Sequence, residues 1–463
     1  MKALPTSLRA AYAAPAFALA AVGIPVYVHL PKFYTDVVGV PVGTLGMLLM
    51  AARLLDGVLD PLIGALSDRT RSRQGRRRPF IAAASIPLAA SLYFLFTPPL
   101  PANAIAPWWF AGWLFAVFFL WAAVMVPYEA LGAELTFDYD QRTSLLALRD
   151  GALLFGTLVA AASPTVASAL LGMPPGPEAE AARFRLVALV YGPLIVAACL
   201  WCAWSVGERV RPRSPDRSLR AGWNDMLANR PFLILLASYA VAAVGSNLPA
   251  TLVLFYVEYV LQSGSADYFM LLYLISGIVC LPMWVAVSRR YDKKRAWLCA
   301  TAVNTGAFLA VWFLGPGDAP LYAVLVVVSG IGFGASIAIP SSMQADVIDY
   351  DELLSGSRRE GSYLGIWAVA RKLAAAVGVG AGLHVLDLAG YVPNAEQTPH
   401  VQSVLVALYA LVPCACNAAG FAIALAYPIG RREHAAIRIA AERRALGHDV
   451  VDPLRGIVLA GAG

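Results

Sequence analysis

The chain has 463 residues, of which 59% are hydrophobic and only 14% are charged, and its mean hydropathy is +0.66. Soluble globular chains carry about 25% charged residues, so a water-soluble fold could not bury this much apolar surface. The same figures exclude disordered, collagen-like and coiled-coil chains. The composition therefore predicts an all-α membrane protein that crosses the bilayer several times.

A helix needs about 20 apolar residues to cross a bilayer, and stretches of that kind recur along the chain. The first is too long for the apolar part of a secretion signal, so we expect it to stay as a helix. The twelve expected spans lie near 10–31, 43–66, 79–97, 107–132, 144–172, 184–205, 231–261, 266–287, 295–314, 320–343, 362–388 and 402–428.

The basic residues are unevenly divided between the two faces that these spans define. Of 35 Lys and Arg residues, 28 fall on the face of the chain termini, and Lys32, Arg183 and Arg185 fall on the other. The positive-inside rule then predicts cytoplasmic N- and C-termini. We expect a multi-pass protein of the bacterial cytoplasmic (inner) membrane. The rule also explains the pI near 9.0 without nucleic acid, for which no basic groove with interleaved aromatic residues is present.

A long polar segment divides the spans six and six. The predicted organisation is an N-terminal six-helix bundle (1–205), a cytoplasmic linker (206–230), a C-terminal six-helix bundle (231–430) and a cytoplasmic tail (431–463) that contains a short helix. Short basic hairpins follow the second and the eighth span, and this match predicts two pseudo-symmetric halves. The predicted conformational-loop residues, which could pair across the cytoplasmic gap, are Asp68, Arg69, Gly75, Arg76, Arg77 and Asp292.

The second span carries three charges on one helical face. Arg53, Asp56 and Asp60 are spaced i, i+3 and i+7, and Pro61 loosens the backbone beside them. Two carboxylates one turn apart in a low dielectric resist being ionised together, which suits a coupling site for H⁺ or Na⁺. The alternative is a structural Arg53–Asp56 pair, with Asp60 capping a local group.

Further charges lie in later spans. Lys372 lies about ten residues into its span and is predicted to pair with the helix-2 acids from the other half, so that cation entry would couple to rocking of the halves. Arg149 could donate to solute hydroxyls or a carboxylate, or could form a salt bridge with a helix-end acid such as Glu134. Asp150 follows Arg149 and should point about 100° away from it, which favours a structural role.

Four segments resemble the glycoside–pentoside–hexuronide:cation symporters, the melibiose permease-like family of the major facilitator superfamily. They are FYTDVVGV (33–40), RLLDGVLDPLIGALSDRTRSRQGRRRPF (53–80), VPYEALGAELTFDYDQRTSLLALRDG (126–151) and ADVIDYDELLSGSRREGSYLGIWAVARKLAAAVG (345–378). The resemblance implies the major facilitator fold, with twelve transmembrane helices. It also implies that Asp56 and Asp60 bind the cation, as metal ligands only if the ion is Na⁺, with Arg53 and Lys372 beside them and Arg149 in the sugar site.

Departures from the family pattern also carry information. Ala20 and Met125 stand where the family has aspartates, and Glu129 stands where it has a tryptophan. With two carboxylate ligands missing, we expect H⁺ rather than Na⁺. Trp367 replaces a family glutamine and could stack on a sugar ring. The predicted substrate-binding residues are Arg149, Trp367, Glu129, Lys372 and Tyr27.

The predicted function is cation-coupled symport of a sugar, glycoside or similar small organic solute by alternating access. The alternative is transport of a lysolipid-like or drug-like amphiphile by the same fold. The expected partners are the solute and the lipid bilayer, with no obligatory protein partner and no cofactor besides the coupling ion. An enzyme is disfavoured because no nucleophile or metal cluster accompanies the carboxylates. The glycine-rich run 330–334 is interpreted as close helix packing, since no Walker motif supports ATP-driven transport.

Overall fold

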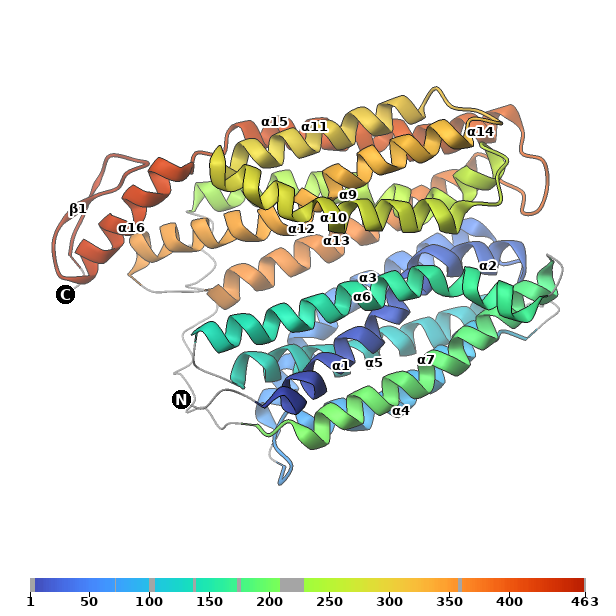
Figure 1. Ribbon diagram of the computed structural model, residues 1–463, viewed down its shortest axis with the longest axis horizontal. Helices are drawn as coiled ribbons and strands as arrows, with labels where there is room; N and C mark the ends of the chain where they lie inside the picture. Colours follow the sequence, from blue (N-terminus) through green and yellow to red (C-terminus); the bar gives the residue numbers. More distant parts are fainter. Residues whose placement is uncertain are drawn as a thin grey trace.

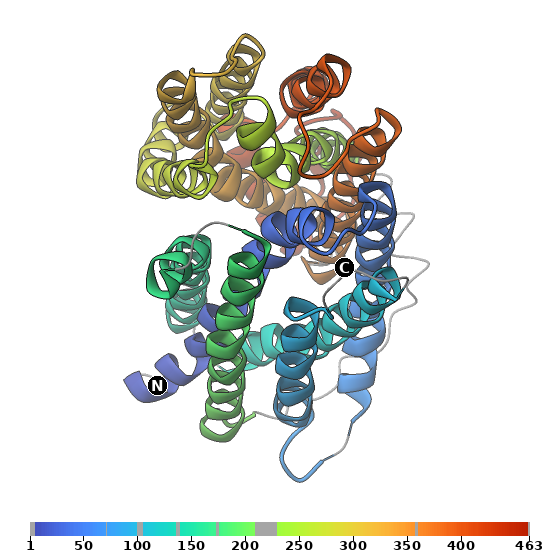
Figure 2. The ribbon, with the colours of Figure 1, turned by 90° about the vertical axis from the view of Figure 1, so that its right-hand side faces the viewer.

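The computed structural model describes residues 5–70, 72–99, 105–135, 139–172, 176–208, 229–356 and 360–461. Two sets of long helices lie one above the other in Figure 1, with both chain termini at its left. Figure 2, turned by 90°, shows the same two sets from the right-hand end. That end of the molecule is called the terminal end below, and the opposite end, near α2 and α14, is called the far end. The predicted fold class, an all-α membrane protein built from two helix sets, is confirmed.

The first set contains the helices before residue 208. They are α1 (Thr6–Ile24), the π-helix η1 (Pro25–His29), α2 (Leu30–Asp36), α3 (Val42–Arg69), α4 (Arg78–Phe96), α5 (Ala106–Glu134), α6 (Tyr139–Leu171) and α7 (Pro177–Ser205).

The second set follows residue 229 and is continued by the tail. It comprises α9 (Arg230–Tyr259), α10 (Ala266–Arg290), α11 (Lys293–Val311), α12 (Ala319–Ser355), α13 (Glu360–Leu388), α14 (Pro399–Val406), the π-helix η2 (Ala407–Leu411) and α15 (Val412–Leu425). The tail comprises α16 (Arg431–Ala445), β1 (Val450–Val451) and β2 (Val458–Leu459).

Each predicted span coincides with a helical segment. Among the described residues, eleven helices are long and apolar enough to cross a membrane, and α11, which begins with three basic residues, is not one of them. Helix α12 continues to Ser355, well beyond the expected end, because its polar last turns pack against α16. The tail helix was expected, but the antiparallel β1–β2 pair was not.

Small residues let helices of the two sets approach closely. A Cβ at Gly46 of α3 would lie 2.7 Å from the Leu383 side chain of α13, and one at Gly380 would lie 2.6 Å from Met50. The run 330–334 packs in the same way, with Gly330 against α10 and Gly332 against α11. The interpretation of these glycines as helix-packing residues is confirmed. Close contact between α3 and α13 positions the candidate site between the two sets.

Candidate functional site: a charge cluster between two helix sets

Lys372 of α13 lies between the two acids of α3. Its Nζ is 2.9 Å from Asp56 Oδ2 and 2.5 Å from Asp60 Oδ2, and it also donates to the main-chain oxygen of Asp56 at 3.4 Å. The structure thus brings together the three residues that the sequence placed on facing helices of different halves. Their role in cation coupling remains a prediction.

The two carboxylates differ in their surroundings. The Asp56 side chain is 8% exposed, and within the described ranges its buried Oδ1 has no hydrogen-bond partner. The Asp60 side chain is 32% exposed, so solvent reaches one acid of the pair. With both acids ionised the cluster has one more negative than positive charge, which a single proton or monovalent cation would neutralise. Within the described ranges, no group of three or more His, Cys, Asp or Glu side chains is placed to hold a metal ion.

Arg53 is bound by aromatic rings. Its guanidinium carbon lies 3.5 Å from the centroid of the Tyr27 ring and 5.8 Å from that of Phe118, a cation–π arrangement. Tyr27 belongs to η1, where Pro25 interrupts the regular hydrogen bonding of the first span. No ion pair joins Arg53 to Asp56 among the described side chains, so the structural pair considered from the sequence is not what holds this helix face.

Arg149 forms an ion pair with Asp150, its neighbour in the sequence, which was expected to point away from it. Its Nε and Nη2 lie 2.8 and 2.7 Å from Asp150 Oδ1, because the long arginine arm folds back along α6. The prediction that Asp150 points away from Arg149 is therefore wrong, and the Glu134 side chain lies outside the described residues. Glu129 of α5 is exposed, and the positive charges of Arg149 in α6 and Arg371 in α13 act on it.

Trp367 is half-buried and stacks on Tyr239 of α9, with ring centroids 4.3 Å apart and planes at 31°. This contact lies within the second helix set and covers part of the ring that was predicted to meet a sugar. The five predicted substrate-binding residues lie in η1, α5, α6 and α13. Of these five, Lys372 is the only one whose side chain forms an ion pair with Asp56 or Asp60 in the part of the chain that the structure describes.

The basic hairpin after α3 closes on an acid that the sequence analysis did not single out. The backbone N–H groups of Arg76, Arg77 and Arg78 donate to the Glu208 carboxylate at 2.6–2.7 Å. Gly75 has a φ of +104°, and a Cβ there would collide with Glu208. A carboxylate at the N-terminus of α4 is stabilised by the unpaired N–H groups and the helix dipole. In the sequence, the one indication of this contact was that Glu208 lies just after α7, the last helix of the first half.

The equivalent hairpin after α10 is held differently. Asp292 Oδ1 accepts from the Lys294 N–H at the start of α11, and Oδ2 accepts from the Arg431 N–H at 3.0 Å. Both oxygens are engaged within the second half and its tail, so the expected pairing of Asp292 across the two halves is wrong. Arg69 is exposed in the last turn of α3, and the Asp68 side chain lies outside the described residues.

A second cluster joins the two helix sets at the far end, and sequence reasoning gave it no role. This far-end cluster consists of Lys32, Asp36, Glu258, Tyr259, Tyr391 and Asn394. Lys32 Nζ lies 2.6 Å from Asp36 Oδ2 and 2.5 Å from Glu258 Oε2. Tyr391 and Tyr259 donate to the Asp36 carboxylate at 2.9 and 3.3 Å.

Tyr391 lies in the loop between α13 and α14. Burial, together with the negative charge of Asp36, raises the pKa of its hydroxyl far above the ordinary value, so it stays protonated and can donate. The segment FYTDVVGV, which contains Asp36, was the available signal for this cluster, but it did not indicate which residues of the other half would meet it.

Two sets of membrane-crossing helices, joined through a charge cluster between them, define a polytopic membrane transporter. The chain belongs to the MFS/sugar transport protein family, whose sequence profile matches residues 11–431.

Individual relatives agree with this membership. The chain is 25% identical over 427 residues to the glucuronide carrier protein homolog of Escherichia coli, covering 90% of this chain and 91% of the relative. It is 24% identical to the isoprimeverose transporter of Lactiplantibacillus pentosus, covering 83% and 81%. A crystal structure of the nucleoside transporter NupG superposes with a TM-score of 0.66 at 13% identity, covering 90% of this chain and 99% of that one, which supports the fold.

Proposed function

We propose that this chain is a cation-coupled symporter of a sugar or glycoside, with H⁺ as the coupling ion. The observation that carries the proposal is the Asp56–Lys372–Asp60 cluster, which is net negative and joins the two helix sets. Among the described residues, Asp56 Oδ1 has no hydrogen-bond partner. A buried carboxylate oxygen without a donor is costly, and binding a proton there removes that cost.

A proton suits this geometry better than Na⁺. The Lys372 ammonium already occupies the space between the two carboxylates, where a metal ion would have to sit. Sodium would also need several oxygen ligands, whereas a proton needs one carboxylate oxygen. Protonation of one acid would weaken its hold on Lys372, and the contact between α3 and α13 could then change as the halves rock.

The solute class follows from two kinds of support. Two relatives are named as a glucuronide carrier protein homolog and an isoprimeverose transporter. On this chain, Arg149 and Glu129 offer a donor and an acceptor, and Tyr27 and Trp367 offer ring faces. We also propose that the terminal end, with its basic hairpins, faces the cytoplasm across a bacterial inner membrane.

The test is uptake into proteoliposomes of the purified full chain, driven separately by a pH gradient and by a Na⁺ gradient. A panel of glycosides, hexuronates and lysolipids, screened first by thermal shift, supplies the labelled solute. We expect a pH gradient to drive accumulation of a glycoside and Asp60→Asn to abolish it. Exchange of labelled for unlabelled solute without a gradient should survive in that variant.

Asp318→Asn is the matched control, because Asp318 lies between α11 and α12 and accepts from the Gly315 N–H. It should leave coupled uptake unchanged. Unchanged accumulation in Asp60→Asn would contradict the coupling role of the cluster. Accumulation driven by Na⁺ alone would contradict the proton, and competition by lysolipids but not by sugars would favour the amphiphile carrier.

A further inference from the structure

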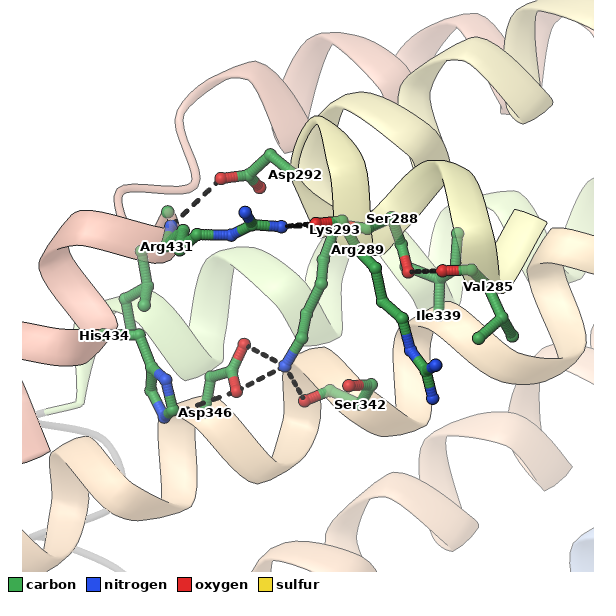
Figure 3. Close-up of a pocket in the computed structure, with 12 residues that line it drawn as sticks. Val285, Ser288, Arg289, Asp292, Lys293, Ile339, Ser342, Asp346, Arg431 and His434 are labelled. Carbon is green, nitrogen blue, oxygen red and sulfur yellow. Dashed lines mark hydrogen bonds and ion pairs between the residues drawn. The ribbon is translucent and has the colours of Figure 1, made fainter. Parts of the chain in front are cut away.

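Two neighbouring hollows lie at the terminal end of α10, away from the charge cluster. One is a cavity of about 350 Å³ enclosed by the ends of α10, α11, α12 and α16 (Figure 3). The other is an open groove along α10 lined by Leu281, Pro282, Val285, Ala286, Arg289 and Arg290. Val285 and Arg289 line both, so the two hollows adjoin each other.

The acids of the enclosed cavity are already neutralised or capped. Lys293 Nζ lies 2.7 and 2.8 Å from the two oxygens of Asp346, and His434 Nε2 lies 3.5 Å from the same carboxylate. Asp292 accepts two backbone N–H groups. A ligand ammonium group would therefore find no free carboxylate in this cavity.

Two arginines at the mouth have no acidic partner. Arg289 and Arg290 are exposed, and neither forms an ion pair within the part of the chain that the structure describes. The Arg289 side chain descends from α10 toward α12 beside Ser342 (Figure 3). The site thus offers unpaired positive charge next to a cavity whose acids are occupied, which selects for an anion.

The groove below the arginines is apolar and uncovered. Helix α10 is among the membrane-crossing helices, and Pro282 and Ala286 are exposed on it. Val279 and Met283 on the same side are 69% and 45% exposed. An exposed apolar face of a spanning helix contacts lipid chains, and the arginines of its last turn lie at headgroup depth.

We propose that this site binds one anionic glycerophospholipid, of the phosphatidylglycerol type. Its phosphate lies against Arg289 and Arg290, its polar headgroup enters the cavity beside Ser342, and one acyl chain follows Leu281, Pro282 and Ala286. Because α16 supplies Arg431 and His434 to the cavity wall, the bound headgroup also contacts the tail helix.

Native mass spectrometry of the purified full chain in detergent tests this site. Phosphatidylglycerol, phosphatidylethanolamine with the same chains, and inorganic phosphate are titrated in turn. We expect phosphatidylglycerol to bind most tightly, and Arg289→Gln to weaken it about fivefold, since one arginine near a lipid surface contributes about 1 kcal/mol. Ala286→Trp, which fills the groove without removing charge, should also weaken it.

Arg295→Gln is the matched control. Arg295 is an exposed arginine at the same end of the molecule and lines neither hollow. It should leave the affinity unchanged. An equal loss in Arg295→Gln would overturn the site in favour of diffuse attraction. Equal binding of phosphatidylethanolamine, or effective competition by inorganic phosphate, would overturn the selection for an anionic lipid.

Discussion

Asp56 and Asp36 are two buried aspartates that each join the helix sets, and their hydrogen bonding differs sharply. Their side chains are 8% and 5% exposed. Asp36 accepts from Lys32, Tyr259 and Tyr391, which engage both of its oxygens. Asp56 binds Lys372 through Oδ2, and no described residue pairs with its Oδ1. The two side chains are thus similarly buried but differ in how many donors they accept, and we expect this difference to separate a carboxylate that holds the helix sets together from one that takes up a cation.

The physical reason lies in the cost of an unsatisfied buried charge. A buried carboxylate with several donors is stabilised in its ionised form, and adding a proton would break those bonds. A buried carboxylate with only one donor is less stable in its ionised form, because few interactions offset the free-energy cost of removing it from water. The far-end cluster is therefore expected to act as a latch, and the Asp56–Lys372–Asp60 cluster as the place where ion binding changes the energy of the cross-half contact.

The largest expected effect comes from removing Lys372. Lys372→Met leaves Asp56 and Asp60 one turn apart without their ammonium partner, and breaking a buried pair in this way costs about 3–5 kcal/mol. We expect a markedly lower Tm in detergent and no coupled uptake.

The double variant Lys372→Met/Asp60→Asn separates charge from packing. It removes the repulsion between the acids and should recover most of the lost Tm, but not the coupling. If the double variant is as unstable as the single one, the methionine itself disrupts the α3–α13 contact, and the charge argument fails.

A crossed pair of substitutions tests the comparison directly. Asp36→Asn places an amide against hydroxyl and ammonium donors and should lower stability by about 1–3 kcal/mol, with gradient-driven uptake reduced only in rate. Asp56→Asn leaves a neutral Lys372–Asp60 pair and should keep or raise Tm while abolishing accumulation. Thermal denaturation and proteoliposome uptake, measured on both variants, test whether Asp36 acts in stability and Asp56 in coupling. An equal loss of Tm in both variants would show that the number of hydrogen-bond donors to the aspartate does not distinguish the two clusters.

The sequence was sufficient for the fold class and for the central acids. Hydropathy located the spans, and the i, i+3, i+7 spacing placed Arg53, Asp56 and Asp60 on one face toward Lys372. Contacts that depend on side-chain reach could not be obtained in this way. Arg149 folds back onto Asp150 and Arg53 turns to Tyr27, choices set by rotamers and by the π-turn of the first span.

The far-end cluster shows a second limit of the sequence. Asp36 is the last residue of α2 and Tyr391 lies in the loop between α13 and α14, 355 residues away, so helical periodicity does not connect the two. Glu208 was missed for a related reason, because its partners are backbone N–H groups at the start of α4 rather than a side chain that a motif could reveal.

The smallest expected effect concerns the latch alone. Tyr391→Phe removes one hydroxyl donor from Asp36, leaving Lys32 and Tyr259, and should weaken far-end closure by about 1 kcal/mol. A shift of that size increases the population of far-end-open molecules roughly fivefold. In a Cys299→Ser background, which removes an exposed native thiol, a cysteine introduced at the buried Val260 beside Tyr259 should then be labelled faster by a fluorescent maleimide. Tyr409→Phe, at a buried tyrosine bonded to Tyr322 within the second helix set, is the matched control. Ion coupling should be unchanged in Tyr391→Phe, because Asp56 and Asp60 are not altered. A loss of coupling in this variant would show that the far-end cluster and the Asp56–Lys372–Asp60 cluster do not act independently.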